Sequence, residues 1–203
     1  VVVGDGAEVG NAITDNADYV AFTGSTATGR KVAERAAGRL IGYSLELGGK
    51  NPMIVLEGTD LNNAAEMAIA GGYGSAGQLC VSTERVYVHQ NDIGNFLEIL
   101  GQKVESLKVG KSSDFTMDIG SPTSAAQLER VSGFVDRAVA DGATVVAGGK
   151  ALPELGPYFY APTVLTNVKH DSPAGCAEIF GPVLVVFPYE RIEEAMQVVR
   201  GLD

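Results

Sequence analysis

Two residues, Cys80 and Glu46, have the side-chain types and the surroundings that covalent catalysis on a carbonyl requires. Cys80 follows a run of small residues, 74–77, which would let a substrate approach the sulfur. A thiol can attack a carbonyl carbon, and a carboxylate can activate the water that releases the product. Glu46 lies in an apolar stretch before Gly48, so we expect its carboxylate to be partly desolvated and to act as a base. An isolated cysteine is more often structural, so the assignment of Cys80 as catalytic depends on the other motifs in the sequence.

Two further segments have the character of an anion or cofactor site. Gly24 and Ser25 precede a helical pattern, and the free amides at the start of a helix bind anions such as a pyrophosphate. The same residues would also form an ordinary helix cap. The second segment is 178–183, Glu-Ile-Phe-Gly-Pro-Val, where Glu178 and Phe180 would otherwise be a surface charge and a core residue.

In this order and spacing, the four segments resemble the aldehyde dehydrogenase superfamily, and in detail its bacterial succinate-semialdehyde dehydrogenases. The resemblance implies that Cys80 is the nucleophile, which forms a thiohemiacetal and then a thioester. It also implies that Glu46 activates the water that hydrolyses the thioester. Phosphorylating and coenzyme-A-acylating relatives do not need this base, so the acid-forming reaction is favoured.

The resemblance further implies a cofactor, NAD or NADP, and a small aldehyde as substrate. Glu178 is expected to accept hydrogen bonds from the nicotinamide ribose, Phe180 to pack near the nicotinamide ring, and Gly24 and Ser25 to face the pyrophosphate. Gly10 and Leu47 complete the expected cofactor contacts, although the glycines at 4, 6 and 10 match a dinucleotide fingerprint only loosely.

Other polar residues near these motifs have less specific roles. Lys50 and Asn51 are expected to be structural, and Cys176 to be a bystander. Ser82 and Arg85 follow the nucleophile, near where an acyl tail would lie. Arg85 either binds a substrate carboxylate or is an ordinary surface or helix-end arginine.

Composition narrows the class of protein. The 203 residues carry a formal charge of −10, which argues against a nucleic-acid partner. No apolar run approaches the ~20 residues that span a bilayer, so no membrane partner is expected. The first residues do not resemble a signal peptide. Two cysteines and two histidines make a disulfide framework or a zinc site improbable, and a cytoplasmic location with no metal is expected.

The pattern of apolar runs and helical stretches predicts an α/β fold. Residues 1–48 are interpreted as the end of a Rossmann-type cofactor domain, and 49–203 as an incomplete catalytic domain. Strands are expected at 1–3, 18–22, 40–47, 53–56, 85–89, 144–147, 160–165 and 183–187, with Glu178 and Phe180 opening the last. Helices are expected at 7–14, 25–36, 61–73, 91–107, 124–140 and 191–200.

Members of the superfamily are roughly twice as long or more, so the chain is expected to be a fragment of a parent protein that forms a homo-oligomer. Two alternative functions stay open: a catalytically incompetent fragment, and a cysteine-dependent esterase that works without cofactor. Production of reduced nicotinamide from an aldehyde would distinguish an aldehyde dehydrogenase from both of these alternatives.

Overall fold

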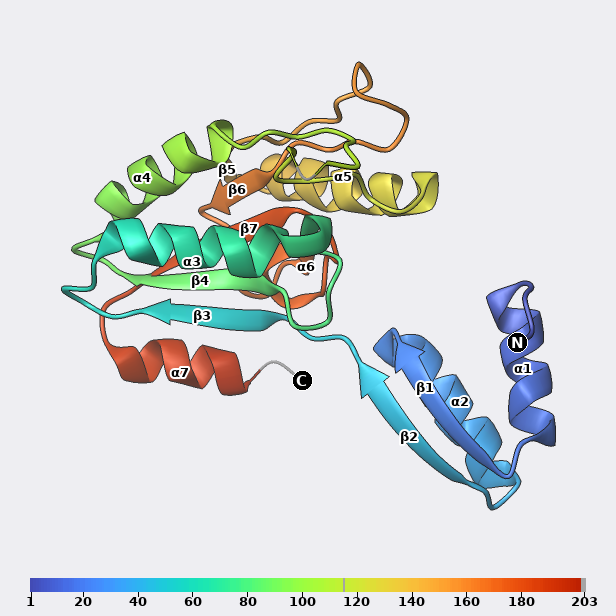
Figure 1. The fold of residues 1–203 in the computed structure, drawn as a ribbon. Helices are drawn as coiled ribbons and strands as arrows, with labels where there is room; N and C mark the ends of the chain where they lie inside the picture. Colours follow the sequence, from blue (N-terminus) through green and yellow to red (C-terminus); the bar gives the residue numbers. More distant parts are fainter. Residues whose placement is uncertain (115, 202–203) are drawn as a thin grey trace. The chain divides into compact units, whose positions relative to one another are not determined.

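The computed structural model describes residues 1–114 and 116–201, which form two compact units. The first is Val1–Gly48 and the second begins at Gly49 (Figure 1). Each unit has its own sheet and its own helices. The assignment of the first unit to the cofactor and of the second to the nucleophile stays a prediction.

The first unit contains two strands and two helices. Its elements are α1 (Gly6–Asn16), β1 (Tyr19–Gly24), α2 (Thr26–Gly38) and β2 (Gly42–Leu47). Asp5 caps α1 through the amides of Ala7 and Glu8, and Ser25 caps α2 through the amide of Thr28. The strand expected at 1–3 is wrong, since these three valines are exposed and outside any sheet.

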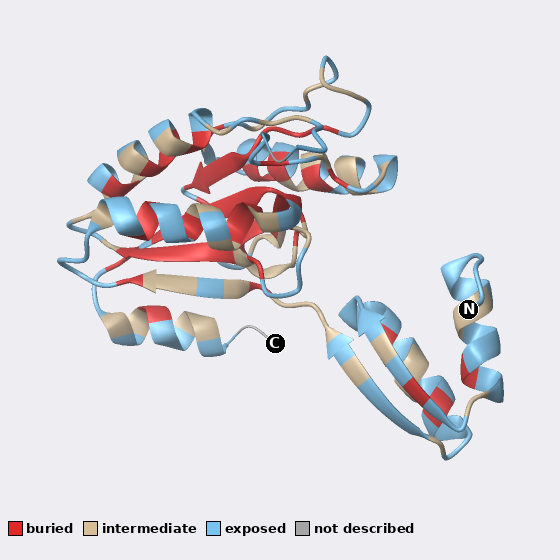
Figure 2. Cartoon of the chain, in the orientation of Figure 1, coloured by how far each residue is buried: buried red, intermediate tan, exposed pale blue. Residues whose placement is uncertain are grey.

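The two strands of this unit are parallel neighbours, with Thr23 opposite Glu46. Four of the 48 residues are buried, Thr14, Val20, Gly29 and Ala36, and most of the unit is exposed in Figure 2. The first unit therefore has a very small core.

The second unit is built on one five-stranded sheet. Its strands lie in the order β3-β4-β7-β6-β5, and all neighbours are parallel except β5 with β6. The strands are β3 (Asn51–Val55), β4 (Thr83–His89), β5 (Thr144–Ala147), β6 (Thr163–Thr166) and β7 (Val183–Tyr189). β4 and β7 are nearly continuous runs of buried residues, as expected for central strands covered on both faces.

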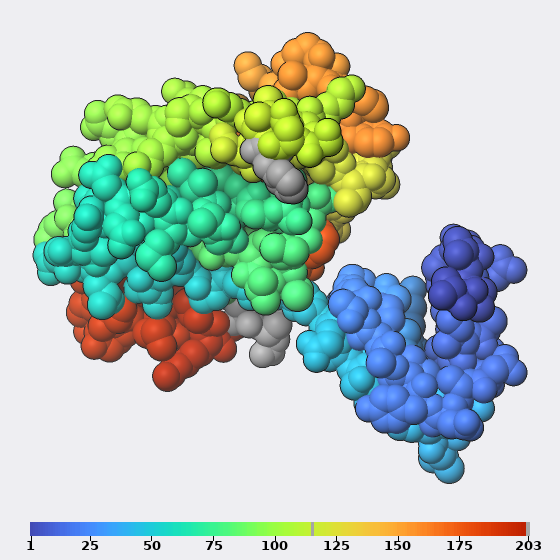
Figure 3. Space-filling view, viewed as in Figure 1, coloured from blue at the N-terminus to red at the C-terminus, as the bar shows by residue number. Residues whose placement is uncertain are grey.

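Helices cover both faces of this sheet. Apolar residues of α3 (Leu61–Tyr73) and α4 (Ile93–Glu105) pack with Val86, Leu184 and Val186 on one face, and the atoms of these two helices are in view in Figure 3. Residues of α5 (Ala125–Ala140) and α7 (Ile192–Arg200) pack with Val185 and Phe187 on the other.

The α/β fold expected from the sequence is confirmed, and the structure adds that most of its strand neighbours are parallel. Two short elements were not expected: the 3₁₀ turn η1 (Gly74–Gly77) and α6 (Pro173–Cys176). Glu178 and Phe180 do not open a strand, since β7 begins at Val183. No helix in the described part of the chain is both long and apolar enough to cross a membrane.

Candidate active site

Two of the segments identified in the sequence, those of Cys80 and of Glu178, lie at one edge of the second unit's sheet, together with Gly49 and Lys50. Each lies just before a strand: Gly49 and Lys50 directly precede β3, two residues separate Cys80 from the start of β4 at Thr83, and two residues separate the segment 178–180 from the start of β7 at Val183. Because these strands are parallel neighbours, their amino ends meet at the same edge. The topology therefore brings Cys80 to the same edge as Glu178 and Phe180, about 100 residues later in the sequence.

Cys80 lies on an exposed loop whose backbone is fixed from the neighbouring strand. The Nδ2 amide of Asn51, at the start of β3, donates to the carbonyl of Cys80 at 2.7 Å and to that of Ser82 at 2.9 Å. The structural role expected for Asn51 is thus confirmed. The loop presents the Cys80 side chain to solvent, while its main chain is held in place.

The residues before Cys80 are anchored too. Gln78 accepts a hydrogen bond from the Thr123 amide at 2.9 Å and donates to the Ser75 carbonyl at 3.1 Å. Gly77 has φ +70°, and a Cβ there would clash with the carbonyl of Gly181. Glycine at 77 is therefore required for close packing of the Cys80 loop on the segment that precedes β7, a reason that the sequence did not reveal.

The segment 178–180 is held through its carbonyl groups by α5. Gln127 donates to the Phe180 carbonyl at 2.6 Å, and Arg130 donates to the Glu178 carbonyl at 2.6 Å. Phe180 has φ +59°, a left-handed conformation that a non-glycine residue adopts only where its surroundings impose it.

The Glu178 side chain is half-buried beside Gly49. Its Oε1 accepts a long hydrogen bond from the Gly49 amide at 3.3 Å. Desolvation raises the pKa of Glu178, and the Gly49 hydrogen bond opposes that shift. A carboxylate in such a position can accept hydrogen bonds from the hydroxyl groups of a ligand.

A buried ion pair that sequence reasoning missed lies behind this edge. Lys50 Nζ and Glu84 Oε2 are 2.6 Å apart, and both side chains are almost fully buried. Glu84 also accepts hydrogen bonds from the amides of Ile179 and Phe180. Glu84 follows Thr83 in the strand β4, and no sequence signal distinguishes it from a surface glutamate.

The structure corrects the interpretation of Arg85 and restricts that of Ser82. Arg85 is buried at 3% exposure and donates to the Lys50 carbonyl at 2.8 Å and to the Tyr87 hydroxyl at 3.1 Å. It is therefore neither a surface arginine nor free to bind a substrate carboxylate. Ser82 is buried, and its Oγ has no hydrogen-bond partner among the described residues.

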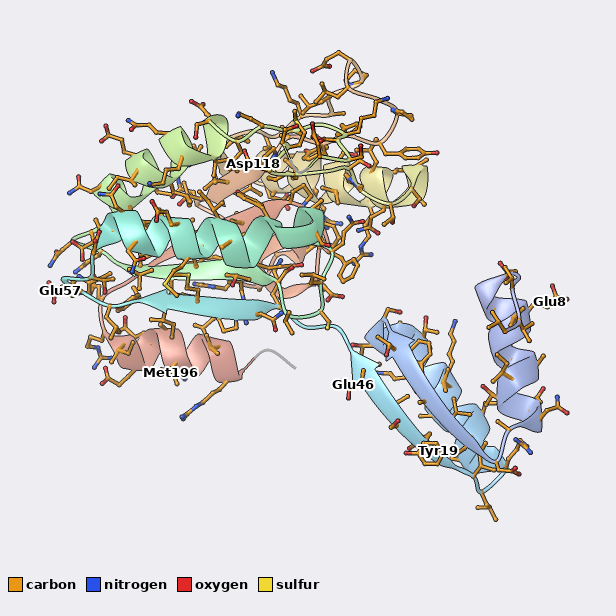
Figure 4. All side chains as sticks on the ribbon, in the orientation of Figure 1. Glu8, Tyr19, Glu46, Glu57, Asp118 and Met196 are labelled. Atoms are coloured by element: carbon orange, nitrogen blue, oxygen red, sulfur yellow. The ribbon has the colours of Figure 1, made fainter. Side chains whose placement is uncertain are left out.

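The remaining predicted residues belong to the first unit. Glu46 lies near the end of β2 with an exposed side chain, labelled in Figure 4, so the first unit by itself does not desolvate this carboxylate and its role as a base stays a prediction. Leu47 packs against Gly29 of α2. The parallel pairing places Gly24 opposite Leu47, next to the Ser25 cap. Strand carboxyl ends beside a helix amino end are typical of nucleotide sites in α/β folds.

Gly10 does not lie in a loop between a strand and a helix. It is in the second turn of α1, and a Cβ there would meet nothing within 4 Å. The structure therefore gives no steric reason for glycine at this position, and a contact of Gly10 with the cofactor stays a prediction. The described residues contain no group of three or more histidine, cysteine or acidic side chains that could hold a metal ion.

Comparison with known proteins assigns the family. The family model described as "Aldehyde dehydrogenase family" matches residues 1–200. The chain belongs to the aldehyde dehydrogenase family. It is 50% identical over all 203 residues to a Mycobacterium tuberculosis protein named "Putative succinate-semialdehyde dehydrogenase (NADP+) 2", of which it covers 39%. A Mycolicibacterium smegmatis protein of similar name is 50% identical over 197 residues, 97% of this chain and 38% of that protein.

Solved structures of the family have the same fold. The NAD+ complex of an aldehyde dehydrogenase from Bacillus cereus superposes with a TM-score of 0.93 at 38% identity, over 98% of this chain and 40% of that one. A betaine aldehyde dehydrogenase from Staphylococcus aureus in complex with NAD+ gives 0.94 at 34% identity, over 98% and 41%. The chain thus spans about two fifths of the relatives that it matches.

Proposed function

We propose that the whole protein oxidises a small aldehyde, of the succinate semialdehyde type, to the carboxylic acid with NAD+ or NADP+. The observation that carries the proposal is the exposed Cys80 on an anchored loop at the same sheet edge as Glu178 and Phe180. Membership of the family and the names of the mycobacterial relatives support both the reaction class and the substrate class.

In the proposed reaction, the Cys80 sulfur attacks the aldehyde carbon and forms a thiohemiacetal. The Cys80 amide donates to the developing oxyanion, the type of stabilisation that preorganised backbone donors supply. Loss of a hydride from the former aldehyde carbon leaves a thioester on Cys80. Glu46 takes a proton from water, which hydrolyses the thioester, so the carboxylic acid leaves and the thiol is restored.

The residues present fit a nicotinamide dinucleotide, which supplies the hydride acceptor when bound. In the first unit, the first-turn amides of α2 can bind a pyrophosphate, and Gly24 and Ser25 form the entrance to that turn. In the second unit, the half-buried Glu178 carboxylate can accept hydrogen bonds from ribose hydroxyls, and the half-buried Phe180 ring offers an apolar surface. The relatives' names and complexes include both NADP and NAD, so either cofactor is proposed.

The test uses the whole protein, meaning these 203 residues with any that flank them in the natural product. Reduced nicotinamide formation is followed at its absorbance with succinate semialdehyde and each cofactor. Cys80→Ala should abolish turnover and leave cofactor affinity nearly unchanged, because the thiol is the covalent catalyst. Cys176→Ala is the matched control and should retain turnover.

Substantial dehydrogenase turnover by Cys80→Ala would contradict the nucleophile assignment. Ester hydrolysis by the wild-type protein with no formation of reduced nicotinamide from any aldehyde would favour a thiol esterase instead.

A further inference from the structure

The Glu84 carboxylate makes an unusual set of contacts for a residue in the interior of a sheet. It lies in β4 with 3% exposure. Oε1 accepts from the amides of Ile179 at 3.0 Å and of Phe180 at 2.9 Å. Oε2 accepts from the Ile179 amide at 3.0 Å and from Lys50 Nζ at 2.6 Å.

Such a buried ion pair is not an efficient way to stabilise a fold. Removing two charges from water costs several kcal/mol for each ion, and a well-packed apolar pair of similar volume is often as stable or more so. Burial alone lowers the pKa of Lys50, and the attraction to Glu84 opposes that shift. The pair is therefore better explained by the position that it imposes on its neighbours than by stability.

The neighbours that it positions are the proposed cofactor contacts. Glu84 holds the amide side of the segment 178–180, while Gln127 and Arg130 hold its carbonyl side. The left-handed Phe180 backbone lies within this double clamp. Because the main chain of this segment is held on both sides, the points from which the Glu178 and Phe180 side chains extend are fixed relative to each other.

We propose that the Lys50–Glu84 ion pair is a positioning device that fixes the Glu178 carboxylate and the Phe180 ring for the nicotinamide half of the cofactor. The inference rests on the proposed function, in which Glu178 and Phe180 contact that cofactor. Glu84 itself touches neither cofactor nor substrate and acts through the main chain of Ile179 and Phe180.

The decisive test replaces the pair with apolar residues in the whole protein. Lys50→Met combined with Glu84→Met should still fold, because removing the desolvation cost of two buried charges offsets much of what is lost when the amides of Ile179 and Phe180 lose their acceptor. NAD+ or NADP+ affinity, measured by calorimetry, should nevertheless fall about tenfold or more, as loss of a positioning contact implies. Amide exchange of Ile179 and Phe180 should accelerate.

Glu84→Gln is the conservative variant. It should also lower the affinity for the cofactor, but by less than the double methionine variant does. The matched control is Glu66→Gln, which breaks the exposed ion pair with Lys103 and should change neither affinity nor exchange at 179–180. A folded double methionine variant with wild-type cofactor affinity would overturn the inference.

If the double variant fails to fold, Glu84→Gln decides in the same way. Wild-type protein that binds no nicotinamide cofactor would contradict the proposed function, and the inference with it. Wild-type protein that binds the cofactor, with the same affinity in the variants that lack the ion pair, would overturn the inference alone.

Discussion

At the scale of the residue, the two cysteines differ in exposure and in setting. Cys80 is exposed on a loop whose carbonyl is held by Asn51, whereas Cys176 is half-buried at the end of α6. Their neighbours in sequence were enough to select Cys80, because four motifs in a fixed order accompany it. The anchoring by Asn51 was not predictable, since it depends on the parallel pairing of β3 with β4.

Glu46→Gln in the whole protein should separate the two half-reactions. Acylation of Cys80 does not need a base for water, so one burst of reduced nicotinamide should survive. Steady turnover should fall by about 10²-fold or more, the size of a general-base contribution. Stopped-flow absorbance measures both phases, and a variant that loses the burst and keeps its steady rate would exclude this role for Glu46.

Cofactor binding should depend on the protonation of Glu178. The ionised carboxylate accepts stronger hydrogen bonds from ribose hydroxyls than the protonated acid does. Desolvation raises the pKa of Glu178 above its ordinary value. Affinity should therefore weaken as pH falls through that raised pKa, at a higher pH than an ordinary glutamate would give. Calorimetric titrations between pH 7 and the acid limit of folding test this. Glu178→Gln should bind weakly at every pH, and a pH dependence that persists in this variant would contradict the assignment.

At the scale of the element, helices were predicted more accurately than strands. α3 was expected at 61–73 and is observed there, because Asp60 caps it and a 3.6-residue period marks its buried face. The apolar run 1–3 was wrongly predicted as a strand, since three valines have high β propensity but no strand pairs with them among the described residues. The segment 178–180 looked extended, but Glu84, Gln127 and Arg130 fix it as a bent approach to β7.

Gly77 should not tolerate a side chain. Gly77→Ala would place a methyl group against the Gly181 carbonyl at a left-handed backbone position, so we expect a loss of about 2 kcal/mol or more of the free energy of unfolding. Gly133→Ala is the matched control, because that helical glycine has free space around it and alanine should stabilise α5 by about 0.5–1 kcal/mol. Urea unfolding followed by circular dichroism measures both, and equal midpoints for the two variants would contradict the packing role.

At the scale of the whole molecule, the two units differ in how much core they bury. The second unit has extensive apolar clusters on both faces of its sheet. The first unit pairs only two strands and buries four residues. Isolated two-stranded sheets with little apolar burial are marginally stable in water. The alternation of strands and helices begins again near Met53, and this predicted two α/β parts. The difference in the number of buried residues between the two units could not be predicted from the sequence.

The contrast predicts unequal protection from hydrogen exchange in the 203-residue chain. Amides of β1 and β2 should have low protection from exchange, because local opening of this unit exposes them. The amides of Val86 in β4 and Val186 in β7, which are fully buried, should open with a free energy close to that of global unfolding. Mass-spectrometric or NMR exchange measures both regions in one sample. Equal protection of β1 and β4 would show that the first unit is stabilised by more than its own core.

Trapping the thioester would show whether Cys80 carries the acyl group. The whole protein with Glu46→Gln is incubated with succinate semialdehyde and NAD+ or NADP+, quenched in acid, digested and analysed by mass spectrometry. We expect a succinyl adduct on the peptide that contains Cys80, formed only when cofactor is present, and none on the peptide that contains Cys176. A burst of reduced nicotinamide without any adduct on Cys80, or with the adduct on Cys176, would exclude Cys80 as the nucleophile.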